Sequence, residues 1–368
     1  MKIGIITMHK VLNFGSALQA YALQQTLFGL GFDNEIIDYQ FPSVSHSKQT
    51  IKKRINGFFV YLRNAIMGFP TEKKISKFQN FYQENYILSS SRYNEKSIKA
   101  NPPLYDIYMT GSDQVWNPKH VKDDTNFLLA FAPSGARKVS YASSFATSVL
   151  PEQYVSIYRK YLSEYNVISV REISGVEMVK YLTGKNATVC CDPTLLLDKE
   201  EWNVLEAKSD LKIKKKYILV YALYYMFDPY PELLNIINYV QKKLSLQVIY
   251  LNGRKEDAIR YNSKVYKSGG PEDFLRLIKN AEFIITSSFH GAVFSILYNK
   301  PFMGIVRDNN SADSRISSLL NNFNSEKCQV AYNDKINFSR EELLNLKADM
   351  TEYNNIKKHA IDYLKESL

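Results

Sequence analysis

Short apolar runs alternate with amphipathic stretches along the chain, and this order limits the possible folds more than any other feature. Lys2–Thr7 is a compact apolar run, and Ser16–Leu30 follows with apolar residues at helical spacing before Gly31 ends it. The same order starts again with the Tyr-, Ile- and Val-rich run Tyr217–Tyr224. Strands that alternate with helices favour parallel sheets covered on both faces. The sequence therefore predicts an α/β fold.

The length and one interruption of the pattern indicate two domains. A chain of 368 residues is too long for one ordinary core and suits two. The charge-rich stretch Asp198–Lys216 separates the two strand–helix series. We therefore place an N-terminal Rossmann-like domain at 1–200 and a C-terminal one at 201–336. Residues 337–368 are predicted to form a final helix that packs back on the first domain.

Residues 46–91 fit neither sheet, and we interpret them as a helical insertion in the first domain. Their core, 51–66, places apolar side chains on one helical face. The basic side chains lie elsewhere around this helix: Lys52, Lys53, Arg54 and Arg63. We favour a helix packed over its domain; the alternative is a helix on an anionic membrane near a lipid-linked substrate. No apolar stretch approaches the length of a membrane span, so we expect a cytoplasmic protein, with peripheral contact at the inner face of the membrane as the alternative.

Composition narrows the range of ligands. Lys and Arg number 47 against 37 Asp and Glu, a net charge of +10 that predicts an anionic ligand or surface. The lysines are scattered and no groove-reading motif occurs, which disfavours nucleic acid. Neither the three cysteines nor the five histidines have zinc-site spacing. Glycine-rich phosphate loops are absent as well, so we predict no metal and no cofactor.

Three strand-to-helix junctions hold the residues that can carry chemistry. Ligands of open α/β sheets bind beyond the carboxyl ends of the strands, where helix N-termini attract anions. The first junction contains Asn13, Gly15 and Ser16, directly before the first long helix. Gly15 permits a close approach of the backbone, and Asn13 and Ser16 are candidate helix caps. The junction is therefore either a ligand contact or an ordinary helix cap.

The second junction, Gly111–Asn117, follows an apolar strand and combines polar side chains with a large ring. Gln114 and Trp116 are suited to hydrogen bonds with sugar hydroxyls and to stacking on a sugar ring. Asp113 is suited to orient or deprotonate a hydroxyl. The alternative is a turn capped by Asp113, with Trp116 in the core.

The third junction, Thr286–Ala292, contains Ser287, Ser288 and His290. The histidine stands at the start of the predicted helix Gly291–Tyr298, at an edge where anions bind. An imidazole titrates near neutrality and can give or take a proton. We therefore favour catalysis or ligand contact for His290 over a structural role.

Arginines near predicted strand ends are candidate anion ligands. Arg171 follows the apolar strand Val167–Val170 and can clamp a carboxylate or phosphate through two hydrogen bonds, or form an ion pair with Glu172. Arg307 and Arg315 flank a polar loop after a later strand, and Arg315 opens a helix. Each of these two is either a ligand contact or a solvated charge.

Five strings of residues together resemble the polysaccharide pyruvyl transferase family. They occur in the family's order over nearly the whole chain: Asn13–Leu23, Gly111–Asn117, Ser169–Glu172, Asp192–Thr194 and Ser288–Gly291. The resemblance implies a GT-B-like fold in which two Rossmann-like domains face each other across a cleft.

The implied reaction moves the pyruvyl group of phosphoenolpyruvate onto two hydroxyls of one sugar. The acceptor would be a cell-surface polysaccharide such as a capsule or exopolysaccharide, or its lipid-linked precursor. The products would be a cyclic ketal and phosphate. By likeness to the family motif, His290 is the acid–base residue, Arg171 clamps the donor, and Asp113 orients or deprotonates the acceptor.

The sequence also departs from the family pattern. Some members carry arginine two residues before the motif histidine, where this chain has Ser288, and asparagine is common where it has Ser287. Another arginine is then needed for the donor, and Arg171, Arg307 and Arg315 are the candidates.

Two other functions fit the same residues. A GT-B glycosyltransferase with a nucleotide-sugar donor would bind a nucleoside diphosphate and not phosphoenolpyruvate. A non-catalytic protein of envelope assembly that binds glycans or anions would keep its ligand affinity after His290→Ala.

Overall fold

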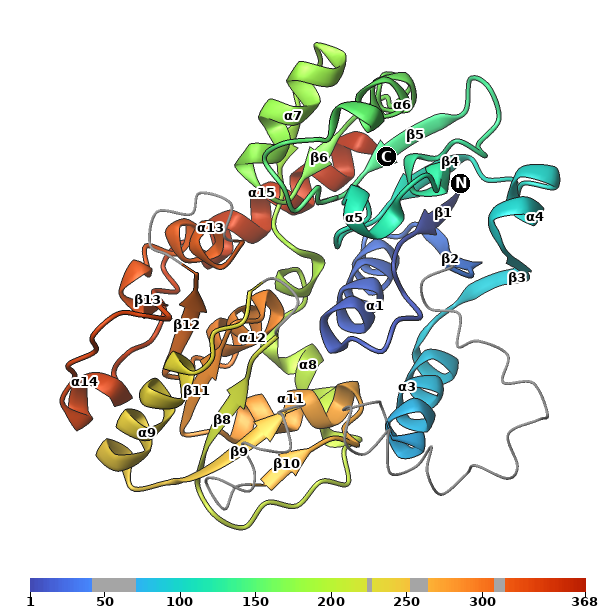
Figure 1. Ribbon diagram of the computed structural model, residues 1–368. Helices are drawn as coiled ribbons and strands as arrows, with labels where there is room; N and C mark the ends of the chain where they lie inside the picture. Colours follow the sequence, from blue (N-terminus) through green and yellow to red (C-terminus); the bar gives the residue numbers. More distant parts are fainter. Residues whose placement is uncertain (42–70, 224–226, 252–263, 308–314) are drawn as a thin grey trace, which may run out of the picture. The chain divides into compact units, whose positions relative to one another are not determined.

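A computed structural model of the protein describes residues 1–41, 71–223, 227–251, 264–307 and 315–368 (Figure 1). The described chain divides into two compact units, and α3 (Glu72–Asn85) contributes residues to both. The first unit contains residues 1–41, 82–197 and 353–368. The second unit contains residues 71–81, 198–223, 227–251, 264–307 and 315–352. The predicted helix over 51–66 lies outside the described residues.

The first unit is built on a parallel sheet with the strand order β3-β2-β1-β4-β5. Its strands are β1 (Lys2–Ile6), β2 (Asp33–Tyr39), β3 (Leu88–Tyr93), β4 (Ile107–Thr110) and β5 (Arg137–Ser140), and a separate parallel pair is formed by β6 (Ser169–Val170) and β7 (Thr188–Val189). Its helices are α1 (Phe14–Gly29), α4 (Glu95–Ala100), α5 (Pro118–Val121), α6 (Glu152–Leu162), α7 (Ile173–Thr183) and α15 (Tyr353–Ser367), with 3₁₀ turns at Thr125–Leu128 and Pro193–Leu195.

The strand order of this sheet creates a switch point between β1 and β4. All four residues of β4 are buried, as expected of a parallel strand covered on both faces. The chain extends the sheet from β1 to β2 and β3, and then returns to the other side of β1 with β4. The loops after β1 and β4 therefore leave the same edge in opposite directions, which is where open α/β sheets bind ligands.

The second unit repeats this arrangement with the order β10-β9-β8-β11-β12-β13, again with every pair parallel. Its strands are β8 (Tyr217–Tyr221), β9 (Gln247–Leu251), β10 (Lys264–Tyr266), β11 (Phe283–Thr286), β12 (Phe302–Val306) and β13 (Gln329–Ala331). Its helices are α8 (Lys199–Ala207), α9 (Glu232–Leu244), α11 (Pro271–Asn280), α12 (Phe289–Leu297), α13 (Arg315–Asn322) and α14 (Arg340–Leu344), with a 3₁₀ turn at Glu326–Cys328. The switch point of this sheet lies between β8 and β11.

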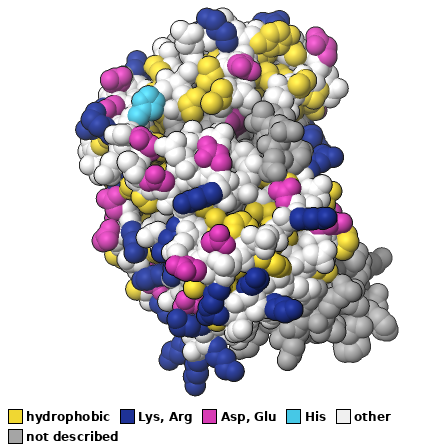
Figure 2. All heavy atoms as spheres, turned by 90° about the vertical axis from the view of Figure 1, so that its left-hand side faces the viewer, with side chains coloured by type: hydrophobic (Ala, Val, Ile, Leu, Met, Phe, Trp, Pro, Cys, Tyr) yellow, Lys and Arg dark blue, Asp and Glu magenta, His cyan; other side chains and the backbone are white. Residues whose placement is uncertain are grey.

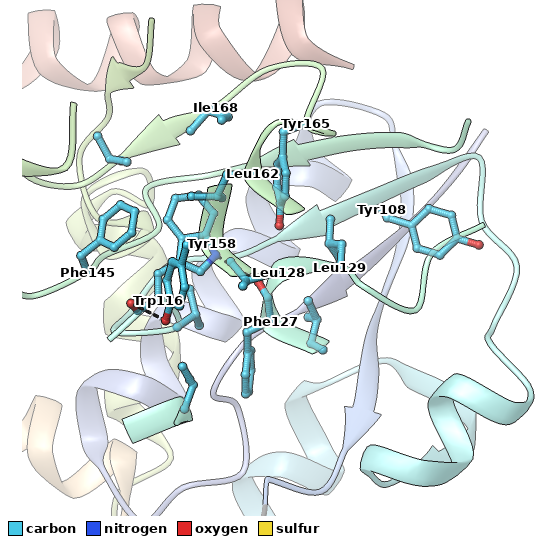
Figure 3. Close-up of a cluster of buried hydrophobic side chains, with 14 of the residues drawn as sticks. Tyr108, Trp116, Phe127, Leu128, Leu129, Phe145, Tyr158, Leu162, Tyr165 and Ile168 are labelled. Carbon is cyan, nitrogen blue, oxygen red and sulfur yellow. Dashed lines mark hydrogen bonds between the residues drawn. The ribbon is translucent and has the colours of Figure 1, made fainter. Parts of the chain in front are cut away.

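An aromatic core in the first unit surrounds Trp116 (Figure 3). The indole is 0% exposed, and its ring centroid lies 5.2 Å from that of Phe145 and 5.9 Å from that of Tyr165. Its Nε1 donates to the carbonyl of Phe127 at 3.0 Å, which satisfies the polar end of the ring. The predicted stacking of Trp116 on a sugar is therefore wrong for this structure, because the ring is fully buried and its N–H donates to Phe127 within the core.

Two parts of the chain differ from the sequence prediction. The end of the segment 46–91 is not part of an insertion, because β3 pairs with β2 and forms the edge of the first sheet. The single helix predicted over 337–368 is two helices, α14 in the second unit and α15 in the first. Helix α15 is joined to the first sheet by the Tyr363 hydroxyl, which donates to the carbonyl of Ser140 at 2.8 Å.

No helix among the described residues is both long and apolar enough to cross a membrane. Figure 2 shows lysine and arginine side chains interspersed with aspartate and glutamate on the viewed face.

Gly291 provides a test of how α12 packs against the second sheet. A Cβ at this position would lie 2.2 Å from Thr286 Oγ1, and that hydroxyl is fixed because it donates to the carbonyl of Tyr221 at 2.7 Å. We expect Gly291→Ala to lower the free energy of unfolding by about 1–3 kcal/mol. Urea denaturation measures it, with Gly29→Ala as the control because a Cβ there meets nothing within 4 Å. Equal stability of the two variants would contradict the described packing.

Candidate functional site

The first and second junctions meet at the carboxyl edge of the first sheet. Ser16, in the first turn of α1, donates its hydroxyl proton to the Asp113 carboxylate. The other carboxylate oxygen accepts from the backbone N–H of Gln114 at 2.9 Å. Asp113 has φ 75°, an uncommon conformation for a residue with a Cβ, and the N–H of Ser144 donates to its carbonyl at 3.0 Å. Such fixed, strained backbone is often found at functional sites.

Asn13 caps α1, which is the alternative considered for the first junction. Its side-chain oxygen accepts from the N–H groups of Gly15 at 2.9 Å and Ser16 at 3.2 Å. The cap fixes the first turn of α1 and thereby presents the Ser16 hydroxyl to Asp113. Ser16 is thus a partner of the candidate catalytic carboxylate rather than the cap itself.

Arg171 is buried at the end of β6 among carboxylates. Its Nη1 donates to Asp192 Oδ2 at 2.7 Å, its Nη2 lies 4.0 Å from Asp113 Oδ1, and its side chain is 3% exposed. Its Nε lies 3.9 Å from Glu172 Oε2. Burial alone would lower the pKa of Arg171, but the three carboxylates outweigh it and raise the pKa. The guanidinium therefore stays charged and holds Asp113 in place.

Asp192 anchors this arrangement, and it was not among the individually predicted site residues. One of its oxygens accepts from Ser112 Oγ at 3.2 Å, and the other accepts from the N–H and Oγ1 of Thr194 at 3.1 and 2.7 Å. The only sequence signal for it was the string Asp192–Thr194 in the family resemblance. The pairing with Arg171 connects β4, β6 and the 3₁₀ turn after β7.

The charge balance of this cluster favours hydroxyl groups over phosphate. Three carboxylates surround one guanidinium, so the local formal charge is negative. A doubly charged anion would be repelled, whereas a sugar hydroxyl can donate to Asp113. The predicted clamp of Arg171 on the donor stays a prediction, and the geometry favours a positioning role for this residue.

The side chain of Gln114 contacts residues that follow closely in the chain. Its Oε1 accepts from Asn117 Nδ2 at 2.8 Å and lies 3.1 Å from His120 Nε2. The side chain is 6% exposed. Its backbone N–H, which donates to Asp113, is therefore its contribution to the site in this structure.

The third junction is assembled at the carboxyl edge of the second sheet. His290 lies in the first turn of α12 and is 6% exposed. Ser288 caps this helix: its Oγ accepts from the N–H of Gly291 at 3.3 Å. The imidazole is held edge-on against Phe289, with ring centroids 5.1 Å apart. The helix N-terminus provides a positive potential beside the histidine, which favours anions.

Ser287 connects two loops instead of pointing its hydroxyl at a substrate. Its Oγ accepts from the N–H of Leu223 at 2.8 Å and donates to the carbonyl of Leu223 at 3.2 Å. The loop after β11 is thereby tied to the chain after β8, across the switch point. Ser287 therefore ties two loops together and Ser288 caps a helix in this structure, and substrate contact by these two serines stays a prediction.

Two arginines of the second unit lie on the loops that follow its strands. Arg315 opens α13, and its guanidinium carbon lies 5.9 Å from the centroid of Phe289, the ring that also contacts His290. Arg307 follows β12 directly and is exposed. No ion pair joins Arg307 to another residue of the described chain.

The predicted residues thus fall into two groups, one in each unit. The first unit brings together Asn13, Gly15, Ser16, Asp113, Gln114 and Arg171. The second unit holds Ser287, Ser288, His290 and Arg315. Within the described ranges, no cluster of three or more His, Cys, Asp or Glu side chains is arranged to hold a metal ion.

Comparison with solved structures defines the class of fold. The UDP-GlcNAc 2-epimerase of Neisseria meningitidis bound to UDP-GlcNAc matches with a TM-score of 0.54 and 9% identity, over 100% of this chain and 99% of that one. The Methanocaldococcus jannaschii UDP-GlcNAc 2-epimerase gives 0.51 and 12% identity, over 94% and 91% of the two chains. S. aureus MnaA, in a structure with UDP, gives 0.52 and 12%, over 94% and 86%. The protein therefore has the GT-B-like fold predicted from its sequence.

The family follows from the sequence comparison. The family model for polysaccharide pyruvyl transferase matches residues 13–309, most of the 368-residue chain. The chain belongs to the polysaccharide pyruvyl transferase family, as its motifs predicted. No curated protein matches the sequence.

The ion pair at Arg171 can be tested by removing its charge. Arg171→Met leaves three buried carboxylates without their cation, so we expect the free energy of unfolding to fall by about 3–5 kcal/mol. The double variant Arg171→Met with Asp192→Asn should recover part of the loss, because it removes one of those carboxylates. Arg92→Met, at an exposed position of β3, is the matched control. Denaturation of all three variants is the measurement, and a fully stable Arg171→Met would contradict the described cluster.

Proposed function

We propose that this family member transfers the pyruvyl group of phosphoenolpyruvate onto two hydroxyls of one sugar and releases phosphate. The observation that carries the proposal is a buried histidine in the first turn of a capped helix, at the switch point of a sheet, in a chain of this family. This placement supplies an acid–base group beside a site for anions.

The reaction needs one acid and one base, and its atoms balance as follows. A proton is added to C3 of phosphoenolpyruvate, C2 becomes electron-deficient, and the first sugar hydroxyl adds to C2 and loses its proton. The bond from C2 to the phosphate oxygen then breaks, and the second hydroxyl adds at C2 and loses its proton. One of the two released protons restores the acid, and the other is carried by phosphate. No external oxidant, reductant or cofactor is required.

His290 is the general acid that protonates C3 of phosphoenolpyruvate in this proposal. Its burial excludes water from the proton transfer, and the neighbouring Phe289 fixes the plane of the ring. Arg315, next to the same phenyl ring, is our ligand for the carboxylate or phosphate of the donor. This arginine would compensate for the serine that stands at position 288, where some family members carry arginine.

Asp113 is the residue that orients or deprotonates the acceptor hydroxyl in this proposal. Ser16 and the N–H of Gln114 donate to its two carboxylate oxygens, and Arg171 Nη2 lies 4.0 Å from one of them, so the carboxylate is held where it can orient a hydroxyl. The acceptor would be a sugar of a cell-surface polysaccharide or of its lipid-linked precursor. A lipid-linked acceptor would place the protein in peripheral contact with the inner face of the membrane.

The reaction is tested by phosphate release from phosphoenolpyruvate with a panel of galactose, mannose and glucosamine derivatives. We expect release only when a sugar acceptor is present, and we expect His290→Gln to lower kcat by about 10²–10⁴-fold because the general acid is lost. His359→Gln is the control, because His359 is exposed on α15. Both variants should keep the thermal stability of the parent protein.

Calorimetry with phosphoenolpyruvate and UDP separates this proposal from its alternatives. Binding of UDP alone, with no release of phosphate from phosphoenolpyruvate, would favour a nucleotide-sugar glycosyltransferase. Glycan binding without turnover, unaffected by His290→Gln, would favour a non-catalytic protein of envelope assembly.

A further inference from the structure

A cavity of about 320 Å³ lies at the carboxyl edge of the second sheet, and among its described lining residues Arg307 is the one already named as a candidate ligand. Its described lining is Phe227, Asp228, Arg307 and Tyr332. Arg307 follows β12 directly, Tyr332 follows β13 directly, and Phe227 and Asp228 lie on the loop after β8. The volume is near the lower end of the range of small-molecule sites, which suits one sugar ring with a substituent.

The strand order brings this cavity to the same edge as His290. β11 lies between β8 and β12 in the sheet, and all pairs among these strands are parallel. The loop that leads from β11 into α12 therefore emerges between the strand ends that carry the cavity lining. The tie between Ser287 and Leu223 fixes the loop after β8 to the loop after β11.

The lining combines the groups that recognise a charged sugar. The rings of Phe227 and Tyr332 lie 5.8 Å apart at a tilt of 48°, so they contact each other and form one corner rather than a slot for a flat base. Such a corner receives the C–H face of a pyranose ring. Asp228 is an acceptor for sugar hydroxyls, and Arg307 is a donor for a carboxylate or phosphate.

Arg307 supplies the positive charge of the lining, which also contains the carboxylate of Asp228. This guanidinium is exposed and has no ion pair with the rest of the described chain, in contrast to Arg171 with its three carboxylates. Tyr332 next to it is held by its backbone N–H, which donates to the carbonyl of Val306 at 2.9 Å. A solvated arginine beside a sugar-sized corner favours an anionic substituent on the sugar.

We propose that this cavity is a subsite for an anionic sugar, a uronic acid or a sugar phosphate, within the acceptor of the reaction. The role of this sugar as part of the acceptor rests on the proposed function. The binding of an anionic sugar rests on the cavity alone. The sugar ring lies in the corner of Phe227 and Tyr332, Asp228 accepts from its hydroxyls, and Arg307 binds its acidic group.

Direct binding tests the subsite without any turnover. Saturation-transfer NMR and calorimetry on the full chain would use glucuronate, galactose 1-phosphate, methyl galactoside, inorganic phosphate and UDP. We expect the two acidic sugars to bind at least about tenfold more tightly than the neutral glycoside, and Arg307→Ala to abolish that advantage. Tyr332→Ala should weaken all three sugars, and Arg92→Ala is the control for charge at an exposed position.

Three other binding results would overturn the proposed subsite. The first is equal affinity of the acidic sugars for the parent protein and for Arg307→Ala, when both proteins have the same thermal stability. Inorganic phosphate as tight as galactose 1-phosphate would indicate a phosphate site without a sugar corner, and UDP tighter than either sugar would indicate a nucleotide site. If acidic sugars bind as expected while phosphoenolpyruvate releases no phosphate, the proposed function fails and the subsite stands.

Discussion

Parallel strand pairing around two switch points is the constraint on which the candidate sites depend. In each sheet a central strand pairs on both sides with strands that follow it in the chain, β1 with β2 and β4, and β8 with β9 and β11. Because all strands run the same way, the loops after the central pair emerge together at one edge. Polar side chains in the segments that follow β1 and β4, such as Ser16 and Asp113, meet through this pairing, and the same holds for the loops around His290.

The two edges differ in charge, and this difference suggests a division of work. In the first unit Arg171 is buried and surrounded by carboxylates, which suits a site that fixes Asp113 for a hydroxyl group. In the second unit Arg307 is exposed and Arg315 packs on the ring beside His290, at the N-terminal end of a helix. Anions would be favoured there. The net charge of +10 thus says less about ligand binding than the local partners of three arginines.

Much of the fold could be predicted because buried parallel strands are continuous apolar runs; β1 and β8 begin at the first residues of the predicted runs Lys2–Thr7 and Tyr217–Tyr224. The edge strand β3 was missed because its sequence, Leu88–Tyr93, is largely polar. For the candidate sites, the sequence could predict which residue types stand at the strand-to-helix junctions, but not which side chains contact one another. Trp116 has polar neighbours in sequence but a core position, and the partner of Arg171, Asp192, is fixed by tertiary pairing over 21 residues that no local pattern reveals.

We propose that an acid of this protein protonates C3 of phosphoenolpyruvate and that C2 becomes bonded to two sugar oxygens. The most direct test of this proposal is NMR of the product formed in D₂O from phosphoenolpyruvate labelled with ¹³C at C2. We predict that the label becomes a quaternary ketal carbon attached to a CH₂D group and bonded to two oxygens of one sugar ring. Label that remains in phosphoenolpyruvate, while a sugar is transferred from a UDP-sugar in the same mixture, would contradict it.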